Sequence, residues 1–409
     1  MSTVNQIKVP FHKAAITKAE EDAVLDVLRS GWLTTGKYAL EFEKKFSEIA
    51  GKGDEGTGRA PVISLAVNSN TSGMILAMEA CGVCEGTYVI TTPYTFVSTA
   101  TCARHLGAHV LFADIEKDTY SIDPNNIEEI LKKAAAEGKI VKAIVPVHIA
   151  GNVCNMKKIM ELAKKYSTAS NKIRVIEDAA HSFPSPTDLG YAGTIGDAGV
   201  FSFYVTKTIT TAEGGMVCTR DSELARRMTV MRMHGMDRTT WDRYTSPRAS
   251  WEYDIIAPGY KFNLPDVLAA IGVCQLDRAW LFYEQRKAIV DMYNKAFSSL
   301  DFIELPPDSP GNSWHLYLMR IVPEKLKITR EQFAKKMQEA GLGISVHFIP
   351  IFHFTYWREL YPDFTAQNYP NAENQYNRTI SIPLYPDMTK EQAELVIETV
   401  KNIGLENHA

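Results

Sequence analysis

The sequence predicts an α/β fold with a mostly parallel central sheet flanked by helices, followed by a smaller C-terminal α+β domain. From about residue 62, short strand-like apolar runs alternate with amphipathic helices. These runs are apolar on both faces, which is typical of a parallel sheet covered on both sides. The chain has 409 residues, enough for two or three domains. We expect a large domain at 1–275, with an N-terminal arm, and a small domain at 276–409.

The expected elements follow one another in a regular order. Thr17 with Glu20 three residues later predicts a capped helix over 17–29, and a second helix is expected over 39–50. Strands and helices then alternate. Strands are expected at 62–67, 87–92, 109–115 and 141–149, and each is followed by a helix, at 71–82, 95–106, 124–137 and 155–166 respectively. Further strands are expected at 174–180 and 199–205. The last part holds helices at 266–298, 329–340 and 389–402, with strand-like runs at 315–322 and 343–349.

The composition excludes several classes of protein. Lys plus Arg is 44 and Asp plus Glu is 48, so a net charge of −4 gives no reason to expect a nucleic-acid or membrane-surface binder. No apolar run approaches the ~20 residues of a membrane-spanning helix, and the N-terminus lacks a signal layout. We therefore expect a cytoplasmic protein.

Cys81 and Cys84 form a CxxC that could bind a metal or do redox chemistry. Because there is no second pair, we interpret it as the end of a helix and expect no metal site.

Small polar residues follow the first expected strand, in the stretch Asn68–Gly73. They open a helix, whose first N–H groups, with the hydroxyls of Thr71 and Ser72, suit a phosphate. A plain helix cap is the alternative interpretation.

Two charged residues lie at the ends of later strands. Asp178 ends a buried strand, where a carboxylate is costly unless it faces a cation, a metal or a protonated ring nitrogen; a structural ion pair is the alternative. Lys207 follows the strand at 199–205, and a desolvated lysine has a lowered pKa and can form a Schiff base. Ser202 could donate to a phosphate. Phosphate loop, carboxylate and lysine at one sheet edge are the groups that pyridoxal phosphate needs. Phe96 could lie over that cofactor or pack in the core.

Nearly the whole chain resembles the DegT/DnrJ/EryC1/StrS sugar aminotransferases, which have the fold of aspartate aminotransferase, the type I fold of pyridoxal-phosphate-dependent transferases. Within that group, APGYKFNLPD and the WDR at 241–243 look most similar to the enzymes that make UDP-4-amino-4-deoxy-L-arabinose. The matching stretches are SGWLTTG (30–36), TPYTFVSTA (92–100), IVPVHIAGN (144–152), VIEDAAHS (175–182), FSFYVTKTITTAEGGMV (201–217), HGM (234–236), GYKFNLPDVLAAIGVCQL (259–276) and ISIPLYPDMT (380–389).

The resemblance implies a role for each matching residue. Lys207 corresponds to the Schiff-base lysine, Asp178 to the partner of the pyridine nitrogen, and His181 to a residue near the cofactor's ring oxygen. Asn263 corresponds to a residue that reaches the phosphate of the partner subunit, with Lys261 beside it, so the resemblance implies a homodimer with shared active sites. The phosphate donors by the same comparison are Thr71, Ser72 and Ser202.

The implied reaction transfers an amino group from L-glutamate to a nucleotide-diphosphate-linked keto sugar, which we expect to be a 4-keto sugar. The product would be an amino sugar for a surface polysaccharide or lipopolysaccharide. His347 and His353 could bind the sugar nucleotide or be interface histidines. Arg243 could meet the diphosphate or the donor's carboxylate, or be a surface residue. Residues 52–61 and 182–192 depart from the family pattern near the expected site and leave the substrate open.

Other functions remain as alternatives. One is a pyridoxal-phosphate-binding regulatory or sensor protein without turnover, which predicts an appended DNA-binding segment or a damaged lysine, and another is a 3-keto-sugar aminotransferase. A simple nucleotide-binding α/β protein predicts a GxGxxG or GxxxxGK[ST] loop, and the sequence has neither. Some relatives carry a histidine in place of the lysine and are dehydratases, so the presence of Lys207 argues against that activity.

Overall fold

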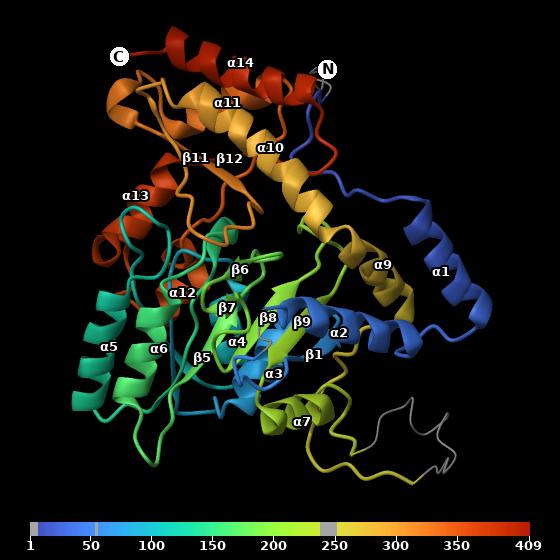
Figure 1. Cartoon of the computed structure of the whole chain (residues 1–409). Coiled ribbons are helices and arrows are strands. Elements are labelled where there is room, and N and C mark those ends of the chain that lie inside the picture. The colour runs from blue at the N-terminus through green and yellow to red at the C-terminus, as the bar shows by residue number, and fades with distance from the viewer. Residues whose placement is uncertain (1–6, 54–55, 238–251) are drawn as a thin grey trace.

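The computed structural model describes residues 7–53, 56–237 and 252–409 (Figure 1). Within these residues, seven strands form a central sheet. Strand β9 runs antiparallel to both neighbours, and the other neighbouring pairs are parallel. The predicted mostly parallel sheet is therefore confirmed. In spatial order its strands are β1 (Ile63–Val67), β9 (Gly215–Thr219), β8 (Ala198–Ser202), β5 (Arg174–Asp178), β4 (Val141–Ile144), β2 (Tyr88–Thr91) and β3 (His109–Phe112).

The helices expected from the sequence are present, with ends that differ by a few residues. The first begins after Thr17, which forms the predicted capping box with Glu20. The helices are α1 (Lys18–Ser30), α2 (Lys37–Ala50), α3 (Asn70–Ala80), α4 (Ser98–His105), α5 (Pro124–Ala136), α6 (Met156–Tyr166), α7 (Ser222–Met231), α9 (Asp266–Asp277), α10 (Ala279–Phe297), α11 (Arg330–Glu339), α12 (Thr355–Leu360), α13 (Pro370–Arg378) and α14 (Lys390–Glu406).

Helices cover both faces of the central sheet, because successive strand residues enter different apolar cores. Val200 of β8 packs in the core that contains α3 and α4, whereas Phe201 packs in the core that contains α2 and α9. Likewise, Ala143 of β4 belongs to the α3–α4 core and Ile144 to the core built with α5 and α6. Burial on both faces explains the continuous apolar runs of the sequence.

A second sheet lies in the C-terminal part. It is antiparallel, in the order β10 (Ile303–Glu304), β11 (Tyr317–Ile321) and β12 (Thr379–Ile382). Helices α10, α11 and α14 share an apolar core with it. The predicted α+β character of this part is thus present, and the domain boundary at residue 275 stays a prediction.

Some local features differ from the expectation. The expected elements did not include helices α7, α12 and α13 or strands β9, β10 and β12, all of which are short. Residues 343–349 do not form a strand, and only Ser345 bridges to Ser381. Instead, residues 346–348 line a cavity, so a tertiary role replaces the expected pairing.

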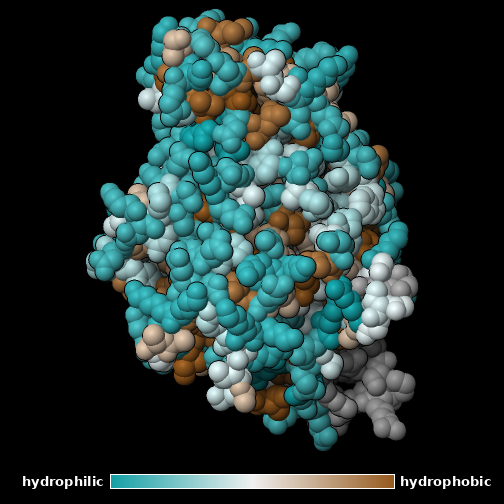
Figure 2. Space-filling model, turned by 60° about the vertical axis from the view of Figure 1, so that its left-hand side comes forward, coloured by the Kyte–Doolittle hydropathy of each residue, from teal (hydrophilic) through white to brown (hydrophobic). Residues whose placement is uncertain are grey.

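The surface on the side of α5 and α6 is mostly hydrophilic, with apolar residues scattered among polar ones (Figure 2). Helix α6 shows the reason, since it buries Met156, Ile159 and Leu162 and turns its lysines outward. Among the described residues, no helix has both the length and the apolar character needed to span a bilayer.

Candidate active site

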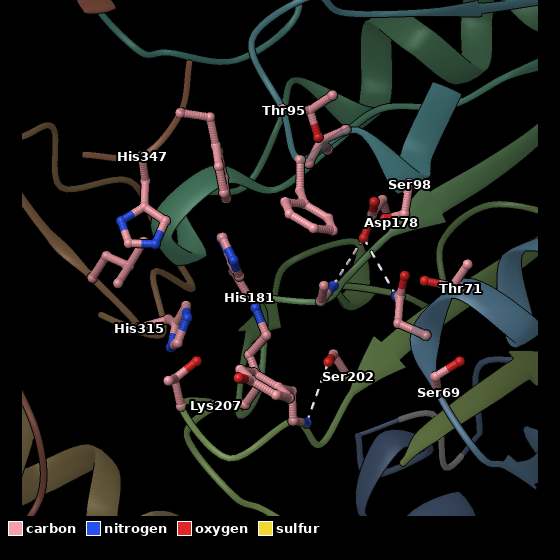
Figure 3. A pocket seen from close by; sticks show the side chains of 18 of the residues that line it. Ser69, Thr71, Thr95, Ser98, Asp178, His181, Ser202, Lys207, His315 and His347 are labelled. Atoms are coloured by element: carbon pink, nitrogen blue, oxygen red, sulfur yellow. Dashed lines mark hydrogen bonds between the residues drawn. The ribbon is translucent and has the colours of Figure 1, made fainter. Parts of the chain in front are cut away.

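A cavity of about 530 Å³ lies at the carboxyl edge of the central sheet, where β5 and β8 end and α3 begins (Figure 3). This is the place where open parallel sheets bind ligands. Seven residues that the sequence analysis selected line it together: Thr71, Phe96, Asp178, His181, Ser202, Lys207 and His347.

Hydroxyl groups and the start of α3 form one end of the cavity. Ser69 caps the helix, its Oγ accepting the N–H of Ser72 at 3.1 Å. The N–H groups of Asn70 and Thr71 have no acceptor within the helix, and Ser202 lies across from them at the end of β8. Gly215 permits the close approach of β9, because a Cβ there would lie 2.7 Å from the backbone nitrogen of Asn70. The arrangement suits an anion such as a phosphate.

Asp178 ends β5 and is 4% exposed. Its Oδ2 accepts the hydroxyl proton of Thr99 at 2.7 Å, and its Oδ1 accepts the N–H of Ala180 at 3.2 Å. Burial raises the pKa of this carboxyl, while the Thr99 hydrogen bond, the Ala180 N–H and the charge of Lys207 act in the opposite direction. The carboxylate therefore lacks a full counter-ion and suits a protonated ring nitrogen.

Lys207 lies in the turn after β8, where its N–H donates to the carbonyl of Tyr204 at 2.9 Å. Burial lowers the pKa of its amine to about 8, and the charge of Asp178 partly opposes this shift. A larger fraction of the amine is consequently neutral near pH 7 than in a free lysine, which is what a carbonyl-binding nucleophile requires.

His181 and Phe96 contribute rings to the cavity. Nδ1 of His181 accepts the N–H of Ala150 at 3.1 Å, and its ring stacks on Phe348 at 5.7 Å. Burial, together with the charge of Lys207, holds the pKa of His181 well below 6.5. Phe96 is 59% exposed and lines the cavity. Its exposure excludes the core interpretation, and its ring lies 6.2 Å from that of Phe348. That Phe96 lies over the cofactor stays a prediction.

The two histidines proposed for the sugar nucleotide have different positions. His347 lines the cavity, and its Nδ1 lies 2.8 Å from Oγ of Ser381. Burial lowers the pKa of His347 to about 4, and Lys207 adds to the shift. His353 is not a lining residue, and its Nε2 lies 2.7 Å from Oε2 of Glu373. The two histidines thus do not share one site within this chain.

The remaining selected residues do not line this cavity. The hydroxyl of Ser72 donates to Oδ1 of Asn68 at 2.6 Å, and the helix cap is the neighbouring Ser69, so a phosphate contact of Ser72 stays a prediction. Asn263 donates to Oγ1 of Thr35 at 2.7 Å, and Lys261 in turn donates to Asn263. That Asn263 and Lys261 reach a partner's cofactor stays a prediction. Arg243 lies outside the described residues.

The two segments that depart from the family pattern do not border the cavity. No described residue of 52–61 or 182–192 lines it, although the second segment directly follows the lining residue His181. They lie close to each other instead, because a Cβ on Gly190 would be 2.5 Å from the guanidinium of Arg59. Their effect on the choice of substrate stays a prediction.

The CxxC lies where α3 ends. Cys81 is buried, and burial raises the pKa of its thiol to about 12, whereas Cys84 is exposed. A thiol with a raised pKa is a poor nucleophile and metal ligand. In the described ranges, no three His, Cys, Asp or Glu side chains form a group that could hold a metal ion.

Several residues of the site were not predicted from the sequence. Asn70, Thr95 and Thr99 lie within the quoted motifs, so their position beside Thr71 and Phe96 was the available signal. His315 gave no such signal, because it precedes a strand far along the chain and reaches the cavity only through tertiary folding.

The donor set of the cavity fits pyridoxal phosphate. A lysine with a lowered pKa, a buried carboxylate without a full counter-ion and a hydroxyl-rich helix start lie in one space, and each matches one functional group of that cofactor.

Comparison with known proteins gives a consistent result. The sequence profile of the DegT/DnrJ/EryC1/StrS aminotransferase family matches residues 14–401. The spore coat polysaccharide biosynthesis protein SpsC of Bacillus subtilis is 38% identical over 398 residues, which cover 97% of both chains.

Solved structures resemble the chain over nearly its full length. Spr1654 of Streptococcus pneumoniae, assigned as a sugar aminotransferase, was solved in its pyridoxal phosphate form; it is 30% identical, with a TM-score of 0.86, covering 97% of this chain and 99% of its own. PseC of Helicobacter pylori, an aminotransferase involved in the biosynthesis of pseudoaminic acid, is 26% identical, with a TM-score of 0.82 over 97% of this chain and 99% of its own.

Proposed function

Because the chain belongs to the DegT/DnrJ/EryC1/StrS aminotransferase family, we propose that it transfers the amino group of L-glutamate to a 4-keto sugar linked to a nucleoside diphosphate. As a member of this family it is a pyridoxal-phosphate-dependent sugar aminotransferase. The observation that carries the proposal is Lys207, whose amine has a lowered pKa and shares a cavity with Asp178 and the hydroxyl-rich start of α3.

Bound pyridoxal phosphate supplies an electron sink that makes the proton on the donor's α-carbon acidic. In our proposal Lys207 holds the cofactor and then moves that proton as general base and acid. Asp178 keeps a proton on the ring nitrogen, and the first turn of α3 with Thr71 and Ser202 binds the phosphate. His181 can donate a hydrogen bond from Nε2, because its Nδ1 accepts the hydrogen bond of the Ala150 N–H.

Several features support the remaining parts of the proposal. The motifs APGYKFNLPD and WDR resemble enzymes that produce a 4-amino sugar, which favours the 4-keto position over the 3-keto position. The name of the B. subtilis relative refers to spore coat polysaccharide, which favours an amino sugar for a surface polysaccharide or lipopolysaccharide. Arg243 is proposed to bind the diphosphate or the donor's carboxylate, with His347 near the sugar.

We further propose a cytoplasmic homodimer with shared active sites. Asn263 supports this. It forms a β-bridge with Val67, and the N–H of Asn68 donates to the carbonyl of Phe262, so Asn263 lies beside the loop that leads into α3. It does not line the cavity of its own chain. In a two-fold dimer the same residues could complete the partner's site.

The experiment is an assay of 2-oxoglutarate release from L-glutamate with the purified protein, pyridoxal phosphate and a panel of 4-keto and 3-keto sugar nucleotides. Release that depends on a 4-keto sugar nucleotide, with formation of the amino sugar, supports the proposal. Cofactor binding without turnover on any member of the panel would favour the sensor alternative, and turnover confined to 3-keto sugars would replace the 4-keto assignment.

A further inference from the structure

His315 is a cavity residue to which neither the sequence motifs nor the family match gives a role. It lies just before β11, is 3% exposed and lines the cavity that contains Lys207. Its ring lies 4.4 Å from that of His181, and Figure 3 shows it between His347 and Lys207. His315 is therefore close to the place where both substrates must present their reacting atoms.

The backbone of His315 is held by a buried cation. Nη1 of Arg286, on α10, donates to the carbonyl of His315 at 2.9 Å, and Arg286 is fully buried. Its Nε and Nη2 have no hydrogen-bond partner among the described residues, and burial lowers the pKa of its guanidinium to about 9. This poorly compensated charge acts on His315: burial, then the nearby His181 and the charges of Lys207 and Arg286, hold the pKa of His315 well below 6.5.

The hydrogen bonds of His315 point to one tautomer. Its Nδ1 is closed to water and has no partner among the described residues. A buried N–H without an acceptor is less tolerable than a free lone pair, and a lone pair is also favoured near a guanidinium. The proton therefore belongs on Nε2. His181 has the same tautomer, because its Nδ1 accepts the Ala150 N–H. The two rings give the cavity neutral N–H donors.

Neutral donors solve a problem that this reaction poses. The amino donor brings carboxylates to the cavity, and the acceptor brings a sugar whose ring oxygens are uncharged. A second buried cation would bind the carboxylates of the amino donor well. It would have no partner when the uncharged sugar is bound, at a cost of several kcal/mol. Among the described lining residues Lys207 is the only Lys or Arg. A neutral imidazole N–H can donate to a carboxylate, a hydroxyl or a carbonyl oxygen alike.

We propose that His315 is a contact shared by both substrates, donating from Nε2 to a carboxylate oxygen of the amino donor in one half-reaction and to an oxygen of the keto sugar in the other. The inference rests on the proposed function, since it takes an acidic donor and a sugar acceptor as given. The positive charge of Arg286, which bonds the backbone carbonyl of His315, strengthens the bond to a carboxylate without contacting it.

The two half-reactions are measured separately in single-turnover experiments, with His315→Gln and His315→Phe against the wild type. Both substrates lose a hydrogen bond with Phe, so we expect the second-order rate constant of each half-reaction to fall about 10- to 100-fold. Gln keeps an N–H donor and should recover most of that loss in both. His105→Asn, an exposed histidine on α4, is the matched control and should change neither.

The outcomes separate the possibilities. If the rate constant of His315→Phe falls in only one half-reaction, or in neither, the shared contact is overturned. A wild-type protein that performs neither half-reaction contradicts the proposed function instead. Because His315→Phe could fail to fold, a second measurement uses wild-type protein labelled with ¹⁵N-histidine. Glutarate, a dicarboxylate without an amino group, should shift the His315 ring resonances, and unshifted resonances at saturating glutarate also overturn the proposal.

Discussion

The amine of Lys207 responds to two opposing influences, burial that lowers its pKa to about 8 and the nearby charge of Asp178 that raises it. Because the neutral amine is the nucleophile, capture of pyridoxal phosphate by the cofactor-free protein should accelerate with rising pH and level off above the pKa. At pH 7 roughly 10% of the amine would be neutral, against roughly 0.03% at an ordinary pKa. Stopped-flow absorbance should give a midpoint near pH 8. A midpoint near 10.5 would contradict the depressed pKa.

Removal of the amine tests the role of Lys207 directly. Lys207→Ala should lose turnover by several orders of magnitude and lose the visible absorbance of covalently held cofactor, because no neighbouring amine replaces it among the described lining residues. Circular dichroism should show an intact fold. Lys335→Ala, whose side chain is exposed on α11, is the control and should retain full activity. Near-normal turnover in Lys207→Ala would contradict the assignment.

Thr99 favours the charged form of Asp178. Its hydroxyl donates to Oδ2 at 2.7 Å and lowers a pKa that burial has raised. Thr99→Val removes the bond at nearly constant volume, so the pKa of Asp178 should rise further and more of the carboxyl should be protonated at low pH. The acidic limb of the pH–rate profile should therefore move to higher pH, with a loss of about 3- to 10-fold at pH values on that limb.

A matched control for this variant lies on the same helix. Thr101 bonds the carbonyl of Val97 and does not contact Asp178, so Thr101→Val should leave the acidic limb in place. If both variants shift the profile equally, the effect belongs to α4 and not to the bond with Asp178.

At the scale of elements, α2 begins where a residue of α9 caps it. The carboxylate of Asp266 accepts N–H groups of Gly36 at 2.7 Å, Ala39 at 3.0 Å and Tyr38 at 3.2 Å, and Asp266 is 2% exposed. Asp266→Ala leaves three backbone donors without this acceptor, so the free energy of unfolding should fall by about 2–3 kcal/mol. Urea unfolding measures it.

Asp277→Ala is the control for the capping residue. Asp277 also lies on α9 and pairs with Lys45 at 3.0 Å, but its side chain is 65% exposed. An exposed ion pair contributes about 0–1 kcal/mol. Equal losses of stability in the two variants would show that the cap of α2 has no special weight.

At the scale of the whole molecule, shared sites can be tested by subunit exchange. Inactive Lys207→Ala chains are mixed with impaired Asn263→Ala chains. In a mixed dimer with shared sites, one site has both defects and the other has neither. Equal mixing makes about half of the dimers mixed, so activity should return to about a quarter of wild type. If activity does not recover after exchange, the shared-site dimer is contradicted. A protein that is monomeric by light scattering at the assay concentration and fully active would contradict it as well.

Much of the architecture was predictable because it depends on local patterns. The alternation of apolar runs and amphipathic helices predicted the sheet and its covering helices, and the capping box at Thr17 marked the start of α1. The expected strand at 343–349 was wrong, since its apolar residues border the cavity and do not pair in a sheet. Short apolar runs have no periodicity that separates the two environments.

The sequence by itself determined the fold class, the family and the chemical groups at the strand ends, because Thr71, Asp178, Ser202 and Lys207 each lie at the end of a recognisable strand or near the start of a helix. The tertiary structure decided what those groups experience. Burial and opposing charges set the pKa of Lys207 and Asp178, and distant segments bring His315 to the cavity and Arg286 behind it. Solvent exclusion and contacts between residues far apart in the chain arise only on folding, so no local pattern encodes them.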